Sequence, residues 1–173
     1  MQPSHIRKTK KPKTGGTGVS PVPNYLQTTR RNLPPWQLGG ATYFVTFRVK
    51  KRTLSEEDRS LVLGACLHWH QRKWRLWAAV AMPDHVHLLV QSLRCGKKEW
   101  YALGKILHSA KSYAAHQINK CRNSSGRVWL DESFDRIVRD EAEFRKKLLY
   151  MAHNPVKAGL ARREGEYRYF WQA

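Results

Sequence analysis

The sequence has few cysteines and no long apolar segment. Its three cysteines, Cys66, Cys95 and Cys121, show no C-x-x-C spacing, which disfavours both a disulfide framework and a zinc knuckle. A reducing, cytoplasmic environment fits this composition best. The longest apolar run, residues 76–82, is far shorter than the ~20 residues of a membrane span. No apolar stretch follows the basic N-terminus, as a signal peptide would require.

Acidic residues are also scarce. The chain has 173 residues, with 13 Asp and Glu against 32 Lys and Arg, and its formal net charge is +19. A surplus of this size is typical of proteins that bind polyanions, among which nucleic acid is the commonest partner. A merely basic soluble protein is the alternative, and charge carries no information about catalysis. Apolar residues make up 41%, which is enough for one hydrophobic core.

The charge is distributed unevenly along the chain. Residues 1–31 contain seven Lys and Arg, no acid, and several prolines and glycines. This composition predicts a flexible basic N-terminal arm, followed by a single folded domain over residues 32–173. The arm either binds phosphates, gaining affinity from the release of counterions, or is an inert solvated tail.

A second basic segment lies inside the expected domain. Residues 91–130 carry a single acid, Glu99, and four aromatic residues are interleaved with the cations. Aromatic rings beside cations suit the unpaired bases of a single strand, although about half of these rings are expected to be core. We expect contacts to DNA from seven residues of this segment: Lys97, Lys98, Lys105, Lys111, Lys120, Arg122 and Arg127.

Periodicity predicts an α+β fold. Ser55 begins one helix as its cap, with Asp58 three residues later, and Pro155 is expected to stop the last helix. The expected strands cover residues 42–49, 75–82, 85–91 and 134–138, and the expected helices cover 55 to about 74, 98 to about 119, and 141–153. This order favours a ferredoxin-like or RRM-like sandwich, in which helices cover a central antiparallel sheet.

Two histidines lie one residue apart on a predicted strand. Successive side chains of a strand point to opposite faces, so His85 and His87 share a face and can share a metal ion. The pair His68 and His70 provides a comparison, because it lies in a predicted helix, where positions i and i+2 diverge. No third His or Cys has zinc-like spacing, which favours oxygen ligands and a hard ion such as Mg²⁺ or Mn²⁺. Two surface histidines are the simpler alternative.

A tyrosine and an asparagine are spaced one helical turn apart near the end of the chain. On a helix, Tyr150 and Asn154 stack on one face, where the hydroxyl can act as a nucleophile and the amide oxygen as a metal ligand. Alternatively, Tyr150 packs beside Phe144, and Asn154 caps a following turn that begins at Pro155.

Three blocks of sequence, taken together, resemble the single-tyrosine HUH transposases. They are residues 83–90 (PDHVHLLV), 134–139 (FDRIVR) and 150–160 (YMAHNPVKAGL). The similarity is greatest to the REP-associated tyrosine transposases, which residues 36–37 and 40–47 also resemble. The resemblance covers about residues 30–163 and implies the HUH transposase fold.

The resemblance implies roles for individual residues. His85 and His87 match the metal-binding pair, Asn154 matches the third protein ligand, and Tyr150 matches the nucleophile. The implied activity is cleavage and joining of single-stranded DNA beside palindromic REP hairpins in a bacterial genome, through a 5′-phosphotyrosine. A divalent ion, Mg²⁺ or Mn²⁺, is the implied cofactor. The REP-associated branch tends to act as a monomer, although dimers occur in the superfamily.

Other functions stay open at this point. A non-catalytic protein that binds DNA hairpins is the main alternative, because the same fold can persist without chemistry. An RRM-like RNA-binding module is less favoured, since residues 44–47 match only the end of the RRM signature. A zinc hydrolase is a more distant possibility.

Overall fold

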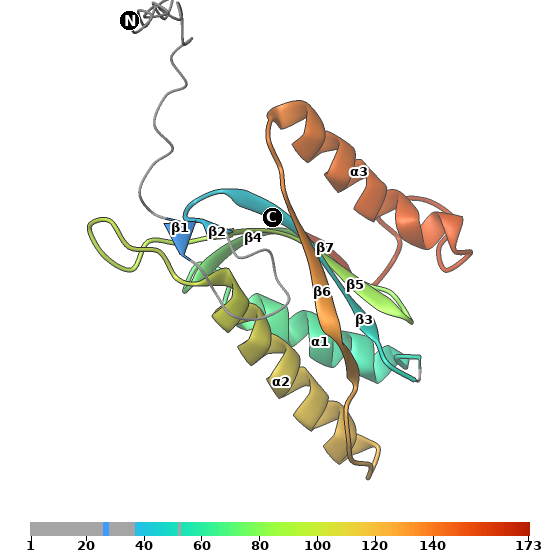
Figure 1. Cartoon of the computed structure of the whole chain (residues 1–173). Coiled ribbons are helices and arrows are strands. Elements are labelled where there is room, and N and C mark those ends of the chain that lie inside the picture. Colours follow the sequence, from blue (N-terminus) through green and yellow to red (C-terminus); the bar gives the residue numbers. More distant parts are fainter. Residues whose placement is uncertain (1–25, 28–36, 52) are drawn as a thin grey trace, which may run out of the picture.

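The computed structural model describes residues 26–27, 37–51 and 53–173 (Figure 1). The expected arm, residues 1–31, therefore lies outside the described residues, except for strand β1 (Leu26–Gln27), which pairs with strand β2 (Gln37–Leu38). From residue 42 the chain runs strand, helix, strand, strand, helix, strand, helix and a short last strand.

Five strands form one antiparallel sheet in the order β6-β3-β5-β4-β7. They are β3 (Thr42–Val49), β4 (Trp74–Ala81), β5 (His85–Ser92), β6 (Trp129–Ile137) and β7 (Phe170–Gln172). Helices α1 (Glu56–His68) and α2 (Leu103–Cys121) lie on one face of the sheet, and α3 (Glu141–Lys157) lies over the other (Figure 1). The expected α+β sandwich is confirmed.

The two faces of the sheet differ in burial because side chains alternate along each strand. On β3, Tyr43, Val45 and Phe47 are almost fully buried in the core, whereas Phe44 and Thr46, on the α3 side, are only partly buried. The core therefore lies mainly between the sheet and the pair α1 and α2. The α3 side is more open, and this is the side on which functional groups can meet a ligand.

The first helix begins where it was expected to and ends earlier. Ser55 and Asp58 form a capping box: the Asp58 backbone N donates to Ser55 Oγ and the Ser55 backbone N donates to Asp58 Oδ2. The expected extension to about residue 74 is wrong. Gln71 has a φ of 58°, which a helix cannot contain, and the fully buried Trp74 begins β4, with its Nε1 donating to the Cys66 carbonyl at 3.1 Å.

The last helix continues through Pro155, so the expected stop before this proline is wrong. The proline ring removes its own N–H from the helix and crowds the preceding turn, but Pro155 is buried, so its packing offsets this cost. Helical bonding resumes beyond it, where the Ala158 N–H donates to the Asn154 carbonyl at 3.0 Å. Gly159, with a φ of 70°, follows the C-cap residue Ala158 and ends the helix. Asn154 is therefore a helical residue and does not cap a separate turn.

Two other elements begin about five residues from where they were expected. Helix α2 begins at Leu103, after a segment in which the Trp100 ring lies against the backbone of Gly39 and Gly40, where no side chain would fit. Strand β6 begins at Trp129, which pairs with Val49 of β3. Both differences come from long-range contacts. No helix among the described residues is long and apolar enough to cross a membrane.

Candidate active site

The turn between β4 and β5 places the first candidate ligand at the start of a strand. The Met82 backbone N donates to the His85 carbonyl at 2.8 Å, and the Val49 N donates to the Asp84 carbonyl at 2.9 Å. The turn is thereby tied to the end of β3. His85 and His87 then point to the α3 face of the sheet, with 4.5 Å between their ring centroids. The structure thus places the two rings as strand alternation requires.

The orientation of the His85 ring follows from its hydrogen bonds. Its Nδ1 lies 2.7 Å from Asp84 Oδ1. An ionised carboxylate can only accept, so Nδ1 carries the proton and Nε2 presents its lone pair. That Nε2 lies 3.1 Å from Asn154 Nδ2 of α3. A carboxylate on the far nitrogen is a common arrangement for a metal-binding histidine, because it fixes both the ring and its tautomer.

His87 is held in a similar way but is more deeply buried. Its Nδ1 lies 2.7 Å from Thr46 Oγ1 on β3, and its ring stacks on Phe44 at 5.0 Å. Burial, assisted by His85 and by the cations of Lys147 and Arg48, lowers the pKa of His87 to about 3. The ring is therefore neutral at physiological pH, the form of imidazole that binds metal ions.

Helix α3 brings the other two candidates to the same place. Tyr150 and Asn154 are one turn apart on the helix, and Asn154 contacts His85. The Tyr150 ring lies 5.4 Å from the His87 ring, and the residue is 49% exposed. Two pairs of residues that are more than 60 positions apart in the sequence thus lie together, with the tyrosine open to solvent. Tyr150 lies at the edge of the site and is exposed, so it is not a core residue.

The potential donors to a divalent metal ion at this place are two imidazole rings and one side-chain amide. His87 Nε2 is buried and has no hydrogen-bond partner within the described part of the chain, so this nitrogen is open to a group that the chain does not supply. Among residues 26–27, 37–51 and 53–173, no three His, Cys, Asp or Glu side chains gather into a metal site. A metal ion at His85 and His87 would need the amide oxygen of Asn154 as a third donor, which requires rotation of the amide, because its Nδ2 now faces His85 Nε2.

Several residues near this site were missed by the sequence analysis. Thr46 orients His87, and only the pairing of β3 with β5 reveals it. Asp84 directly precedes His85 and holds its ring, but the sequence analysis gave it no role. Lys147 Nζ lies 4.7 Å above the Phe44 ring, and its position three residues before Tyr150 on a helix is the signal that could have identified it.

The predicted DNA-binding cations lie away from these four residues. They lie on α2 and in the loops on either side of it, and α2 covers the opposite face of the sheet (Figure 1). Lys97, Lys98, Lys105 and Lys120 are exposed. Lys111 is partly buried, donates to Ser133 Oγ at 2.9 Å, and has a pKa lowered by desolvation.

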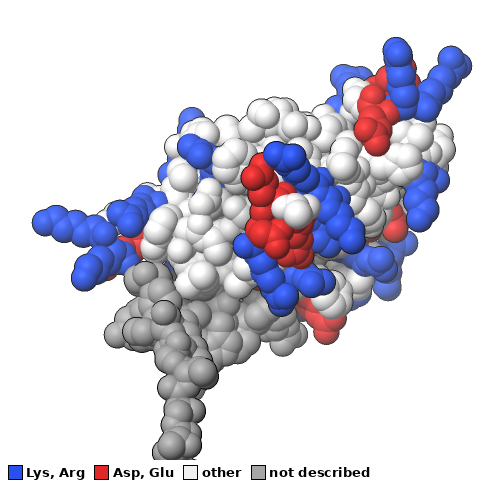
Figure 2. Space-filling model, turned by 90° about the horizontal axis from the view of Figure 1, so that it is seen from above, with Lys and Arg blue, Asp and Glu red and all other residues white. Residues whose placement is uncertain are grey.

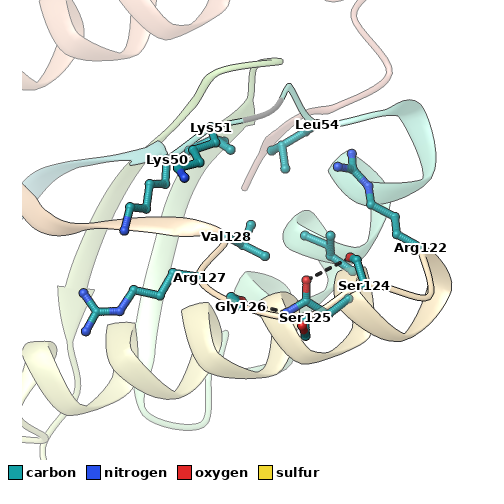
Figure 3. Close-up of a pocket in the computed structure, with 12 residues that line it drawn as sticks. Lys50, Lys51, Leu54, Arg122, Ser124, Ser125, Gly126, Arg127 and Val128 are labelled. Carbon is teal, nitrogen blue, oxygen red and sulfur yellow. Dashed lines mark hydrogen bonds between the residues drawn. The ribbon is translucent and has the colours of Figure 1, made fainter.

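The remaining two predicted cations line a pocket at the end of α2 with a volume of about 290 Å³ (Figure 3). Arg122 lies on the opposite side of this pocket from Lys50 and Arg127. Arg122 pairs with the buried Asp58 and donates to the Thr53 carbonyl at 2.9 Å. Arg127 pairs with an exposed carboxylate of the following strand at 2.5 Å. Both guanidinium groups are therefore already engaged within the chain.

The interleaved aromatic residues are mostly structural. Trp129 is buried and donates its Nε1 to the Lys111 carbonyl at 2.8 Å, Trp100 lies against two glycines, and Tyr101 is partly buried. Tyr113 is 56% exposed, but it belongs to α2 on the opposite face of the sheet from Tyr150. It is therefore poorly placed as a base-stacking partner for a strand at the candidate site.

The histidine pair used for comparison, His68 and His70, does not lie within one helix as expected. His68 is the last residue of α1, but His70 lies beyond the helix, so its predicted helical position is wrong. His70 Nδ1 accepts a hydrogen bond from the Leu76 N–H at 3.1 Å, which makes it part of the chain reversal before β4.

The fold is that of a known tyrosine transposase. A solved structure of a REP-associated tyrosine transposase bound to a REP hairpin matches with a TM-score of 0.60 and 17% identity, over 83% of this chain and 77% of that chain. A solved structure named as a transposase of Deinococcus radiodurans R1 covers 66% of this chain and 91% of that chain, at 15% identity and a TM-score of 0.47.

A protein with a similar sequence carries the same family name as the first of these solved structures. A REP-associated tyrosine transposase of Haemophilus influenzae is 27% identical over 135 residues, which are 69% of this chain and 73% of the relative. No protein-family model matches the chain. The two comparisons confirm the resemblance to the REP-associated tyrosine transposases, in sequence and in fold.

Proposed function

We propose that this chain is a tyrosine transposase that cuts and rejoins single-stranded DNA beside REP-type hairpins in the bacterial cytoplasm, at the nucleoid. The observation that carries this proposal is the convergence of His85, His87, Asn154 and Tyr150 from β5 and α3. The relatives support it, since one is named a REP-associated tyrosine transposase and another is bound to a REP hairpin.

The proposed reaction exchanges one phosphoester bond for another. The Tyr150 oxygen attacks the phosphorus of a phosphodiester, and the bond between that phosphorus and the 3′ oxygen breaks. The proton that leaves the tyrosine is taken up, directly or through solvent, by the departing 3′ oxygen. The products are a 5′-phosphotyrosine and a free 3′-hydroxyl, so the break can be resealed by another 3′-hydroxyl without ATP.

The residues around Tyr150 supply orientation and charge. His85, His87 and Asn154 would hold the Mg²⁺ or Mn²⁺ ion, which when bound stabilises the negative charge that develops on the phosphate. Asp84 and Thr46 keep the two imidazole rings in position. We expect a monomer to suffice, because one chain supplies all the candidate catalytic residues.

Cations lie on both faces of the sheet, where they can contact a polyanionic substrate. Seen from above, Lys and Arg side chains gather at both ends of the view and near its middle, with Asp and Glu among them (Figure 2). Arg48 and Lys147 lie close to His87. These two cations suit the cleaved strand, whereas the exposed lysines of α2 and its flanking loop suit the hairpin stem.

Covalent trapping tests the proposal. The full chain is incubated with a REP hairpin that carries single-stranded flanks and Mn²⁺, and is then separated under denaturing conditions. We expect a protein–DNA conjugate that is absent with a chelator and absent with Tyr150→Phe, a change that deletes one hydroxyl. Tyr150→Phe is expected to keep nearly full hairpin affinity. Tyr113→Phe is the matched control, because this exposed tyrosine lies on the other face of the sheet.

Two results would contradict the proposal. A conjugate that persists with Tyr150→Phe would assign the nucleophile to another residue. Hairpin binding without any conjugate, over a range of metals and flank sequences, would instead indicate a non-catalytic hairpin-binding protein.

A further inference from the structure

A large apolar side chain stands exposed on the open side of the sheet. Phe134 on β6 is 67% exposed, and its neighbour Ser133, which points to the opposite face, is buried. The exposure arises because α3 packs over β4 and β5. The part of the α3-side face formed by β3 and β6 is consequently left uncovered. Folding does not require a phenylalanine at this position, since the ring contributes little to the core.

The strand register places Phe134 in line with the candidate active site. Phe134 pairs with Thr46 on β3, and Thr46 pairs with His87 on β5. Paired residues of neighbouring strands point to the same face, so the three side chains form one row across the sheet. Two interstrand spacings separate the backbones of Phe134 and His87, which is about 10 Å.

Cations surround this row of side chains. Arg136 lies two residues further along β6 on the same face, and its Nε is 3.5 Å from Glu143. Arg48 lies opposite His85 in the register of β3 and β5, and Lys147 Nζ lies 4.7 Å above the Phe44 ring. The uncovered face therefore combines an exposed aromatic ring with positive charge, beside a candidate nucleophile.

An unpaired nucleotide matches this surface better than a protein partner does. A nucleobase has an apolar π-face that stacks on an aromatic ring, and it carries an anionic phosphate that the cations attract. A protein partner would need a contiguous apolar patch. The register partner of Phe134, Thr46, and its same-face neighbour along β6, Arg136, are instead polar, and Lys147 lies over the nearby Phe44 ring.

We propose that Phe134 stacks on an unpaired base of the strand that Tyr150 cleaves, and so positions that strand across β3 and β6. This inference rests on the proposed function. It assigns to Phe134 a role in binding and positioning, and not in the chemical step. The sequence analysis placed base stacking in residues 91–130, on the opposite side of the sheet.

Equilibrium binding to two DNAs tests this role. One DNA is a REP hairpin with single-stranded flanks, and the other is the same hairpin without flanks. Measurements are made with a chelator, so that binding is separated from cleavage. We expect Phe134→Ala to weaken binding to the flanked hairpin about tenfold, the loss of one stacked base, and to leave binding to the bare hairpin unchanged. Phe134→Trp is expected to retain wild-type affinity for both DNAs.

A matched control is available on the same strand. Leu130 is also a large exposed apolar residue, at 39% exposure, but it lies at the opposite end of β6. We expect Leu130→Ala to bind both DNAs like the wild type. Thermal unfolding of each variant shows whether the fold is retained, and the exposure of both side chains predicts that it is.

The outcomes separate this inference from the proposed function. Unchanged affinity of Phe134→Ala for the flanked hairpin, or an equal loss on both DNAs, overturns the stacking role. If Tyr150 still forms its conjugate in that case, the proposed function stands and only the role of Phe134 falls. Photocrosslinking with 5-iodouracil in the flanks is expected to attach DNA at Phe134, and attachment only at other residues contradicts the inference.

Discussion

The substitution Thr46→Val tests how the most buried candidate ligand is held. Thr46 Oγ1 lies 2.7 Å from His87 Nδ1, and His87 is 5% exposed, so water has little access to replace a lost partner. Valine has the β-branched shape of threonine and lacks only the hydroxyl. The change therefore removes one hydrogen bond and preserves the packing of β3.

The size of the effect follows from this geometry. A buried polar group that loses its partner costs about 1–3 kcal/mol of stability. Loss of a residue that orients a metal-binding histidine weakens metal binding about 10–100-fold, or about 1.4–2.8 kcal/mol. We expect Thr46→Val to stay folded, to be destabilised within this range, and to bind Mn²⁺ at least tenfold more weakly than the wild type.

Calorimetric titration with Mn²⁺ in the absence of DNA measures this effect directly, and denaturant unfolding measures stability. Thr42→Val is the matched control, because Thr42 lies on the same strand and face but pairs with Gln91 instead of a histidine. The reasoning is refuted if Thr46→Val binds Mn²⁺ as tightly as the wild type, or if Thr42→Val loses as much affinity.

Three further predictions concern the metal, the basic pocket and the N-terminal arm. We expect His85→Ala to abolish metal-dependent conjugate formation in the trapping assay, and His68→Ala to retain it; equal loss in both variants would indicate a folding role. In denaturant unfolding, Arg122→Ala is expected to lose about 3–5 kcal/mol, because it leaves the buried Asp58 carboxylate without its counter-ion. Arg127→Ala should lose less than about 1 kcal/mol, since its ion pair is exposed; a reversed order would contradict this assignment. Deletion of residues 1–25 removes five Lys and Arg while keeping β1. If the arm binds phosphates, the deletion flattens the salt dependence of binding by about 0.7 log units per lost single-strand contact, and an unchanged slope means that the tail is inert.

The local features of the fold and the site could be predicted from the sequence, because their causes are local. Alternation of apolar and polar residues predicted β3 at its observed bounds, and the capping box at Ser55 predicted the start of α1. Strand alternation put His85 and His87 on one face, and helical spacing put Tyr150 and Asn154 on one face. Each of these inferences needs only the repeat of one element.

Element boundaries that depend on distant contacts could not be predicted in this way. The α1 helix was expected to reach residue 74, but the burial of Trp74 in the sheet ends it at His68. Helix α3 was expected to stop before Pro155, but the proline is buried and the helix continues through it. In both cases tertiary packing outweighs a local preference, which for a proline inside a helix is worth about 3 kcal/mol.

By itself, then, the sequence determined which residues share a face, and its resemblance to a transposase family joined the two faces into one expected site. Only the tertiary structure decided how the site is supported. Thr46 meets His87, and Phe134 lies in the same row, because β3 pairs with β5 on one side and with β6 on the other. Such pairings join residues more than 40 positions apart, and their register is set by the burial of whole strands, which no local repeat encodes.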